Sequence, residues 1–399
     1  MTTTTGREAT MQAQQQPTTM RAVVHERYGT PEVLRVTDVG VPQIADDEVL
    51  VRVHAAGVDP GVWFFLTGKP YVVRAASGPR RPRRPILGRA VAGRVQAVGS
   101  AVTQWRPGDE VVAELSSGAY AEYVAAPAKA LARKPAGLTF AQAATLPISA
   151  TTALQALRDA GRAGPGKHVL VNGASGGVGT FAVQIAAALG AEVTAVCSTR
   201  NADLLRSIGA DHVVDYTRED FTAGGPRYDV ILDLIGNHSL RESRRALTAT
   251  GTLVLSAGPP APVFRRMIAA FALSPFVGHR LVPLVATPKA ADLDAVRDLV
   301  DEGKVTPVLD RTFDLADTAG ALRHQGDGHA RARPSSRSDP PAPLSRPRTG
   351  PARTAGCARS RGRRAPCPRR SRPPAGRGPR PSRRAPRRRP PRAAAGPPG

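Results

Sequence analysis

Small residues at a characteristic spacing carry the clearest chemical signal in this sequence. The run Ala174-Ser175-Gly176-Gly177-Val178-Gly179 joins a segment of strand type, His168–Asn172, to a segment of helix type, Gly177–Leu189. Small residues there allow a tight turn and let backbone N–H groups approach a pyrophosphate, whose charge the helix N-terminus favours. The run therefore predicts a dinucleotide site. The alternative is a glycine-rich turn that only packs the helix on the strand.

The end of the next strand bears on which nicotinamide dinucleotide such a site would take. An NAD site usually carries Asp or Glu there, to bind the ribose 2′-hydroxyl. Here Val193–Cys197 is followed by Ser198, Thr199 and Arg200, with no acid in the turn. Because a guanidinium offers a forked, charged set of donors to a 2′-phosphate, we expect Ser198 and Arg200 to select NADPH. The alternative is that Arg200 only caps or solvates the next helix.

Alternating strands and helices would hold these residues in place. After a helical stretch at Phe140–Ala160, the predicted strands are His168–Asn172, Glu192–Cys197, Tyr228–Leu234, Thr252–Ser256 and Val305–Phe313. The predicted helices are Gly177–Leu189, Ala202–Ile208, Leu240–Leu247, Ala291–Glu302 and Ala316–His324. The alternation from His168 to Ser256 predicts a parallel sheet covered by helices on both faces. Val263–Leu284 is apolar and has no assigned element.

The chain before this region is rich in short strands. These are Met20–His25, Val33–Val39, Val49–Ala56, Ala90–Val98 and Asp109–Glu114. Glycines and prolines between Gly57 and Pro70 predict a loop region, and a basic loop follows at Pro79–Pro85. The pattern indicates a β-rich domain or partial barrel.

The charge of the chain is unevenly distributed. The 399 residues carry a formal net charge of +24, and Arg331–Gly399 contributes +20 of it, with 21 Arg and one acid. With 17 Pro and a single Leu, this tail cannot build a core and is predicted to be disordered. The composition of the whole chain excludes a collagen, a coiled coil and a disulfide scaffold.

Cysteine usage and apolar runs bear on the compartment. Only Cys197 lies outside the tail, so no disulfide framework exists and a cytoplasmic location is expected. No apolar run reaches the length of a membrane span. Met1–Thr19 lacks the apolar core of a secretory signal and is predicted to be a disordered leader, with Met11 and Met20 as alternative starts.

Several motifs match one family as a set. They occupy residues 57–60, 88–99, 106–111, 172–179, 210–216 and 233–236. Together they resemble the medium-chain dehydrogenase/reductase superfamily, and most closely its zinc-independent quinone oxidoreductase (zeta-crystallin-like) branch. The resemblance implies an α/β protein, in which a β-rich GroES-like catalytic domain surrounds a Rossmann domain with a doubly wound parallel sheet. It also implies that the nicotinamide lies between the two domains.

The same resemblance sets the domain boundaries. The chain would consist of a leader (1–19), the GroES-like domain (20–142), the Rossmann NADP-binding domain (143–288), a return to the GroES-like domain (289–330) and the tail (331–399). Members of the family are commonly dimers or tetramers, so a homo-oligomer is expected.

Residues at the family's zinc positions depart from the zinc-dependent pattern. Those members place Cys shortly after the third strand, where this chain has Asp59, and Gly-His-Glu where it has Gly88-Arg89-Ala90. The four clustered Cys of their structural zinc are also absent from this sequence. Thiolate and imidazole donors are missing, so no metal site is expected. Without a Lewis acid, reduction of a quinone or enone by NADPH fits better than alcohol oxidation.

The resemblance implies further contacts to the bound molecules. Asp59 stands where relatives often have Asn near the nicotinamide, and Thr152 matches a Thr that approaches it. Trp63 and Tyr71 would wall an apolar pocket or, alternatively, belong to the core between the domains. The cofactor contacts implied are Tyr216 near the adenosine phosphate, Leu234, Ile235 and Gly236 under the nicotinamide ribose, and Ser256 and Ala257 at the carboxamide. The histidines 54, 168 and 212 are predicted to be structural.

The end of the chain departs from the family pattern. Relatives continue after Gly328–Arg331 with a short apolar strand that completes the catalytic domain. We interpret the Arg/Pro-rich tail as a frameshifted or mispredicted end, which would leave a sheet edge unpaired. The alternative is an arm that binds nucleic acid without sequence specificity.

The predicted function is an NADPH-dependent, zinc-free reductase of quinones or α,β-unsaturated carbonyls. Two alternatives remain. One is an NADP-dependent alcohol or aldehyde oxidoreductase, and the other is a cofactor-binding protein that associates with nucleic acid through its tail.

Overall fold

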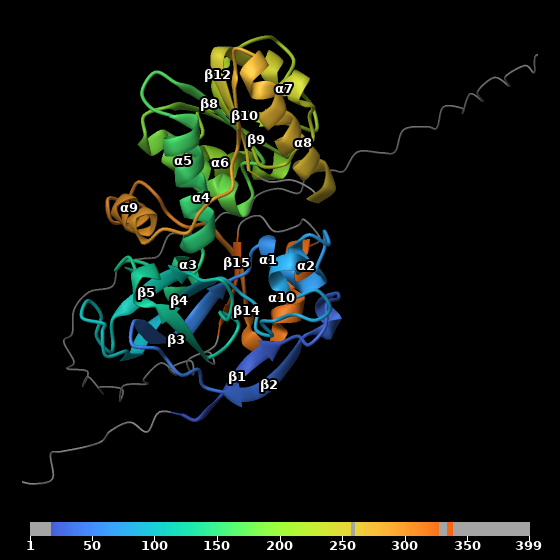
Figure 1. Ribbon diagram of the computed structural model, residues 1–399. Coiled ribbons are helices and arrows are strands. Elements are labelled where there is room, and N and C mark those ends of the chain that lie inside the picture. Colours follow the sequence, from blue (N-terminus) through green and yellow to red (C-terminus); the bar gives the residue numbers. More distant parts are fainter. Residues whose placement is uncertain (1–16, 257–259, 327–332, 338–399) are drawn as a thin grey trace, which may run out of the picture. The chain divides into compact units, whose positions relative to one another are not determined.

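The computed structural model describes residues 17–256, 260–326 and 333–337, in which two sheets form the framework (Figure 1). The larger sheet is mostly antiparallel and belongs to the β-rich part. The other has six strands and is wholly parallel. This confirms the predicted α/β class. No helix in the described ranges is long and apolar enough to cross a bilayer.

The β-rich part is a seven-stranded sheet with a separate hairpin. Its strands run in the order β14-β15-β3-β4-β5-β7, with β6 pairing to β3. Their bounds are β3 (Glu48–Gly57), β4 (Ala90–Val98), β5 (Glu110–Glu114), β6 (Tyr123–Pro127), β7 (Leu131–Arg133), β14 (Leu309–Asp314) and β15 (Arg333–Arg337). The hairpin is β1 (Thr19–Val24) with β2 (Arg35–Gly40). Val49, Val51 and Val53 of β3 are fully buried in one core, together with the ring of Tyr120.

A short helix, α1 (Gly61–Thr67), replaces much of the loop predicted between Gly57 and Pro70. A second short helix, α2 (Val73–Ser77), follows it. Val62 and Leu66 lie four residues apart on α1 and are both buried in the core of the β-rich part, which explains why the segment is helical. Gly68 ends α1 in the left-handed conformation, with φ 60°. The glycines therefore mark the limits of a helix and not a loop.

The parallel sheet has the strand order β10-β9-β8-β11-β12-β13. Its strands are β8 (His168–Asn172), β9 (Glu192–Cys197), β10 (His212–Asp215), β11 (Tyr228–Asp233), β12 (Leu247–Leu255) and β13 (Arg280–Pro283). Numbered from the first strand, this is the 3-2-1-4-5-6 order of a doubly wound sheet. Val169 and Val171 point into one apolar cluster and Leu170 into another, so both faces are covered.

Four helices of this part follow the prediction, with shifted ends: α5 (Gly177–Ala188), α6 (Ala202–Ser207), α7 (Leu240–Arg245) and α9 (Ala290–Asp301). A fifth helix, α8 (Pro260–Leu273), was not predicted. The unassigned apolar stretch contains most of α8 and all of β13. The predicted helix at Phe140–Ala160 divides into α3 (Phe140–Ala143) and α4 (Thr151–Leu154), with wider helical turns at Leu146–Ala150 and Gln155–Gly161.

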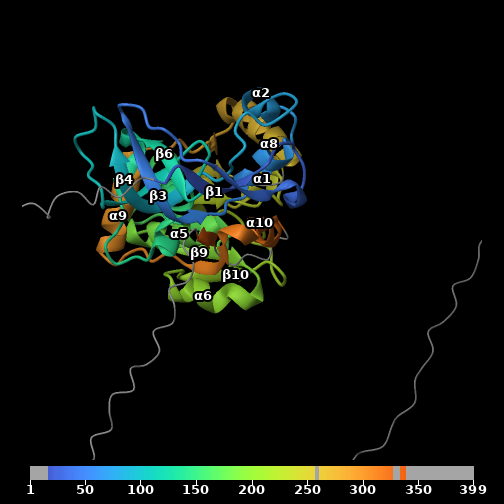
Figure 2. The same cartoon turned by 90° about the horizontal axis from the view of Figure 1, so that it is seen from below.

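The chain returns to the β-rich part after α9. β14 joins its sheet, and α10 (Thr318–Gly326) lies next to α1 in both views (Figures 1 and 2). A Cβ placed on Gly326 would lie 3.1 Å from a ring carbon of Trp63, so the end of α10 packs directly on α1.

The prediction of an unpaired sheet edge is wrong. β15 lies inside the segment predicted to be disordered, and it pairs with β14 on one side and with β3 on the other. Ladder hydrogen bonds come from the main chain, so a strand can form there without the apolar side chains that relatives carry. The remaining predicted tail, residues 338–399, and most of the predicted leader, residues 1–16, lie outside the described residues.

Candidate active site

The turn between β8 and α5, where the sequence predicts a dinucleotide site, is rich in glycine. Gly173 has φ 88°, and Gly176 precedes the first turn of α5 without any side chain to cap it. A Cβ on Gly179 would lie 2.2 Å from the carbonyl oxygen of Gly173, so only glycine lets the helix sit this close to the turn. The N–H groups of the first turn thus have no side-chain cap and suit an anion.

Asp233 organises the adjoining edge of the sheet. This carboxylate, 1% exposed, accepts hydrogen bonds from Asn172 Nδ2 (2.9 Å) and Gly236 N (2.9 Å) on Oδ1, and from Arg266 Nη2 (2.7 Å) on Oδ2. These bonds hold the loop after β11 against the turn after β8. A Cβ on Gly173 would lie 2.8 Å from Ile235 Cδ1, so the structure brings the two predicted cofactor segments together.

Sequence reasoning missed Asp233 and Arg266 as organising residues. A charged residue at the end of a buried strand needs hydrogen-bond or ion-pair partners. The sequence could therefore have indicated that Asp233 binds neighbouring groups. Arg266 lies on α8, which the sequence left unassigned. Its Nε and Nη1 atoms are buried and have no hydrogen-bond partner among the described residues. Such a guanidinium suits a ligand that carries acceptor oxygens.

The end of β9 places the predicted selectivity residues at a mostly exposed turn. Arg200 is exposed and makes no ion pair within the described part of the chain. Ser198 Oγ accepts a bond of 3.5 Å from Asn201 Nδ2. Tyr216 follows the neighbouring strand β10, where its N–H donates to Cys197 O (3.0 Å) and its side chain is 62% exposed.

A carboxylate that the sequence did not suggest lies beside this turn. Asp215 ends β10, directly opposite Cys197, and accepts a hydrogen bond from Thr199 Oγ1. Hydrogen bonds from Thr199 and Thr217 lower the pKa of Asp215, so it is ionised at neutral pH. The turn after β9 and its neighbour therefore carry both a guanidinium and a negative charge.

One further predicted cofactor residue, Ser256, lies at the carboxyl end of a strand. Ser256 N donates to Asp233 O (3.2 Å), which places it at the end of β12. Ala257 lies outside the described residues. Thr152 is 8% exposed on α4. The glycine cradle and the buried guanidinium of Arg266 fit a phosphate-bearing dinucleotide, which Ala174–Gly179 would hold by its pyrophosphate.

Comparison with known proteins agrees with this geometry. Residues 45–136 match the alcohol dehydrogenase GroES-like domain, and residues 208–333 match a family described as zinc-binding dehydrogenase. The NAD(P)H oxidoreductase RTN4IP1 of Mus musculus is 35% identical, over 79% of this chain and 88% of its own length. The 2-methylene-furan-3-one reductase of Solanum lycopersicum is 33% identical, over 74% of this chain and 72% of its own. The quinone oxidoreductase structure from Coxiella burnetii has a TM-score of 0.72 at 30% identity, over 80% of this chain and all of that one.

This chain belongs to the medium-chain dehydrogenase/reductase superfamily. It falls in the quinone oxidoreductase-like branch and is an NAD(P)H oxidoreductase of the quinone oxidoreductase and enone reductase type. The doubly wound sheet is therefore the Rossmann domain of this superfamily, and the β-rich part is its GroES-like domain.

The GroES-like domain shows what occupies the superfamily's zinc positions in this chain. Asp59 is 2% exposed, and Arg89 Nη2 donates to Glu114 Oε1 at 2.5 Å. A Cβ on Gly61 would lie 2.7 Å from Asp59 Oδ1 and 3.7 Å from Arg89 Nη1, so both groups converge on this glycine. Arg89, which the resemblance aligns with an imidazole ligand of zinc-dependent members, is thus a permanent cation held in an ion pair.

The structure separates the two aromatic residues predicted to wall the pocket. Trp63 packs against the core of the GroES-like domain itself and on Gly326. Tyr71 is 69% exposed, and the guanidinium of Arg74 lies 4.9 Å from its ring centroid. Tyr71 therefore lies on the surface of the described structure.

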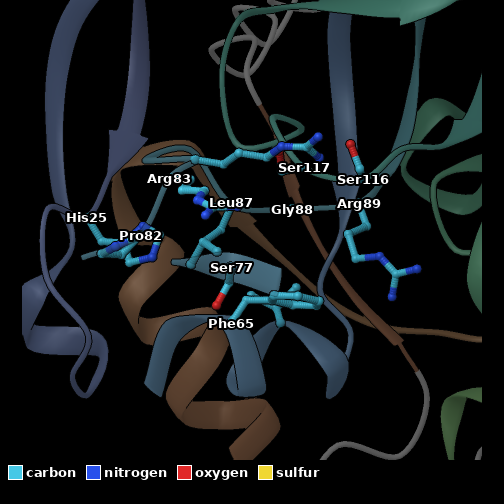
Figure 3. Close-up of a pocket in the computed structure, with 12 residues that line it drawn as sticks. His25, Phe65, Ser77, Pro82, Arg83, Leu87, Gly88, Arg89, Ser116 and Ser117 are labelled. Atoms are coloured by element: carbon cyan, nitrogen blue, oxygen red, sulfur yellow. The ribbon is translucent and has the colours of Figure 1, made fainter. Parts of the chain in front are cut away.

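A pocket of about 470 Å³ lies next to Arg89 in the GroES-like domain (Figure 3). Phe65 and Leu87 supply apolar surface, and the basic loop contributes Arg83 and Arg84. Figure 3 shows the Arg83 side chain reaching toward Ser117. Neither Arg83 nor Arg84 makes an ion pair with any described residue. The pocket thus combines apolar surface with uncompensated positive charge.

Proposed function

We propose that this chain is an NADPH-dependent reductase that transfers hydride to a quinone or an α,β-unsaturated carbonyl without zinc. The observation that carries the proposal is the glycine cradle at Gly173–Gly179, held against the 234–236 loop by Asp233. NADPH would supply the hydride. The protein binds and orients both partners, which accounts for much of the rate in reactions of this kind.

The choice of NADPH is supported by Arg200, which has no ion-pair partner among the described residues at the turn after β9. The negative charge of Asp215 would repel a phosphate at this turn, but its carboxylate accepts hydrogen bonds from the hydroxyls of Thr199 and Thr217. The names of the relatives leave the choice between NADH and NADPH open, so it is a proposal from this turn.

The absence of zinc from the reaction is supported by the Arg89–Glu114 ion pair. A cation at the position of a ligand repels a metal ion, and neither Asp59 nor Arg89 offers the thiolate or imidazole that zinc sites use. Chelation is expected to leave the activity unchanged. Activity that falls on chelation and returns with Zn²⁺ alone would contradict this part of the proposal.

The acceptor is proposed to lie beside Arg89, with its apolar portion on Phe65 and Leu87. Quinones and enones fit because their reduction requires only that a developing oxygen anion be stabilised. Arg89 is proposed for that role because its guanidinium and Asp59 both lie around Gly61. The runner-up, an alcohol or aldehyde oxidoreductase, lacks a Lewis acid here.

A substrate panel tests the proposal. The full chain is assayed with NADPH and NADH against neutral quinones, alkenals and simple alcohols. We expect NADPH oxidation with quinones or alkenals and none with alcohols. Oxidation of alcohols by NADP⁺, with no reduction of quinones or alkenals, would favour the alternative oxidoreductase.

We also propose that the chain forms a homo-oligomer in the cytoplasm. Phe271 and Phe276 are 77% and 84% exposed, just before the edge strand β13, and such surfaces favour association. Light scattering of the purified chain would test this. The cytoplasmic location is inferred from the cysteine usage alone, and nucleic-acid binding is proposed only for the tail.

A further inference from the structure

Three side chains of types that can bind a metal ion lie together on one face of the Rossmann sheet. His168, Glu192 and His212 are the first residues of β8, β9 and β10, three adjacent parallel strands. His168 pairs with Glu192 in the register, and His212 pairs with Thr194, two residues further along β9. Residues two apart on a strand share a face, so the register places all three side chains together.

The ligand atoms of this cluster are close enough to share one ion. They all lie within 4.8 Å of one another. Glu192 Oε1 is 2.7 Å from His212 Nε2 and 4.0 Å from His168 Nε2. In a tetrahedral zinc site with bonds of about 2.0–2.2 Å, the ligand atoms lie roughly 3.4 Å apart. The observed separations bracket that value, and the half-exposed Glu192 has room to adjust.

We propose that His168, Glu192 and His212 bind one divalent transition-metal ion, with Zn²⁺ as its representative. Two imidazoles and one carboxylate suit Zn²⁺ and similar ions, whereas Mg²⁺ and Ca²⁺ prefer sites built wholly of oxygen. Water would complete the coordination, because His212 and Glu192 are 58% and 53% exposed. The sequence predicted no metal site, since its argument concerned only the superfamily's zinc positions.

The site lies away from the predicted cofactor edge. His168 begins β8 and the glycine turn follows its last residue, so the strand separates the two by roughly 13 Å. The β10 strand pairs with β9 alone within the described sheet. The bound ion would link β10 to β9 and β8, and is therefore expected to stabilise this edge without entering the reaction.

Zinc titration of the full chain tests this site. The chain carries C357S and C367S, so that the tail thiols cannot bind metal, and is first treated with a chelator. We expect one Zn²⁺ per chain at this site by calorimetry and a rise in Tm, with no such rise from Mg²⁺. H212A and E192A each remove one direct metal ligand. Each should weaken Zn²⁺ binding at least about tenfold, because even mutating a residue that only hydrogen-bonds to a metal ligand typically costs that much affinity.

H54A is the matched control, because His54 stacks on Phe140 in the other domain. It should bind Zn²⁺ as the parent does. Both His212 and Glu192 are exposed, so their variants should fold, which the Tm without metal verifies. Equal Zn²⁺ affinity in the parent, H212A and E192A, or no binding in the parent, would overturn the proposal.

Discussion

Among single residues, the proposed choice of NADPH rests on Arg200 and its neighbours. The turn after β9 offers one guanidinium, while Asp215 already places a carboxylate beside Thr199. Ser198→Asp would add a second carboxylate where an acid binds the ribose 2′-hydroxyl of NAD. We expect S198D to shift the ratio of kcat/KM for NADPH over NADH toward NADH, and an unchanged ratio would refute the assignment.

Arg200→Ala tests the same turn by removing the proposed contact to the 2′-phosphate of NADPH. Losing a charge-assisted contact to the 2′-phosphate should lower kcat/KM for NADPH by about tenfold and leave that for NADH nearly unchanged. R206A is the control, because Arg206 is a nearby exposed cation that pairs with Asp203 on α6. An equal loss of kcat/KM for NADPH in R206A would show that the loss comes from the overall positive charge of this region and not from a contact at the turn.

Cys197 lies at the end of β9, beside the same site, yet it is expected to be inert. Burial, with a further contribution from the charge of Asp215, raises the pKa of this thiol to about 11. At pH 8 roughly one thiol in a thousand would be ionised. With Cys357 and Cys367 replaced by Ser, we expect no reaction with a disulfide reagent within minutes until denaturant is added. Rapid labelling of the native protein would contradict this.

Among the elements, the basic loop Pro79–Pro85 brings positive charge to the pocket of the GroES-like domain. Its Arg83 and Arg84 line the pocket, whereas Arg80 and Arg81 of the same loop do not. If the pocket takes the acceptor, R83A/R84A should lower kcat/KM for a sulfonated naphthoquinone by about tenfold relative to the neutral naphthoquinone. R80A/R81A should change neither, and an equal loss in both double variants would refute the assignment.

The elements also show which predictions a sequence allows. The β8–α5 turn was predictable, because the chemistry of a phosphate cradle is local and requires small residues in consecutive positions. The helix α1 was not predicted, because glycines such as Gly61 and Gly68 occur both within loops and at the ends of helices. Contacts between residues far apart in the sequence depend on strand register, which no single segment specifies. Examples are the hydrogen bond of Thr199 to Asp215 and the cluster of His168, Glu192 and His212.

For the whole molecule, β15 is the last strand that the structure describes. The backbone of β15 joins β14 and β3, so a chain cut after Ala330 loses a strand between two others. A chain cut after Arg337 keeps that strand and removes only residues outside the described structure. The two truncations therefore separate the role of the sheet from that of the basic tail.

We expect the chain ending at Arg337 to keep the Tm and reductase activity of the full chain. The chain ending at Ala330 should have a Tm lower by several degrees, because two strand edges lose their pairing and each lost kcal/mol lowers the Tm by about 2–4 °C. Any salt-sensitive binding of nucleic acid should disappear in both truncations. Equal Tm values for the two would mean that β15 contributes nothing, and that the GroES-like sheet is complete without it.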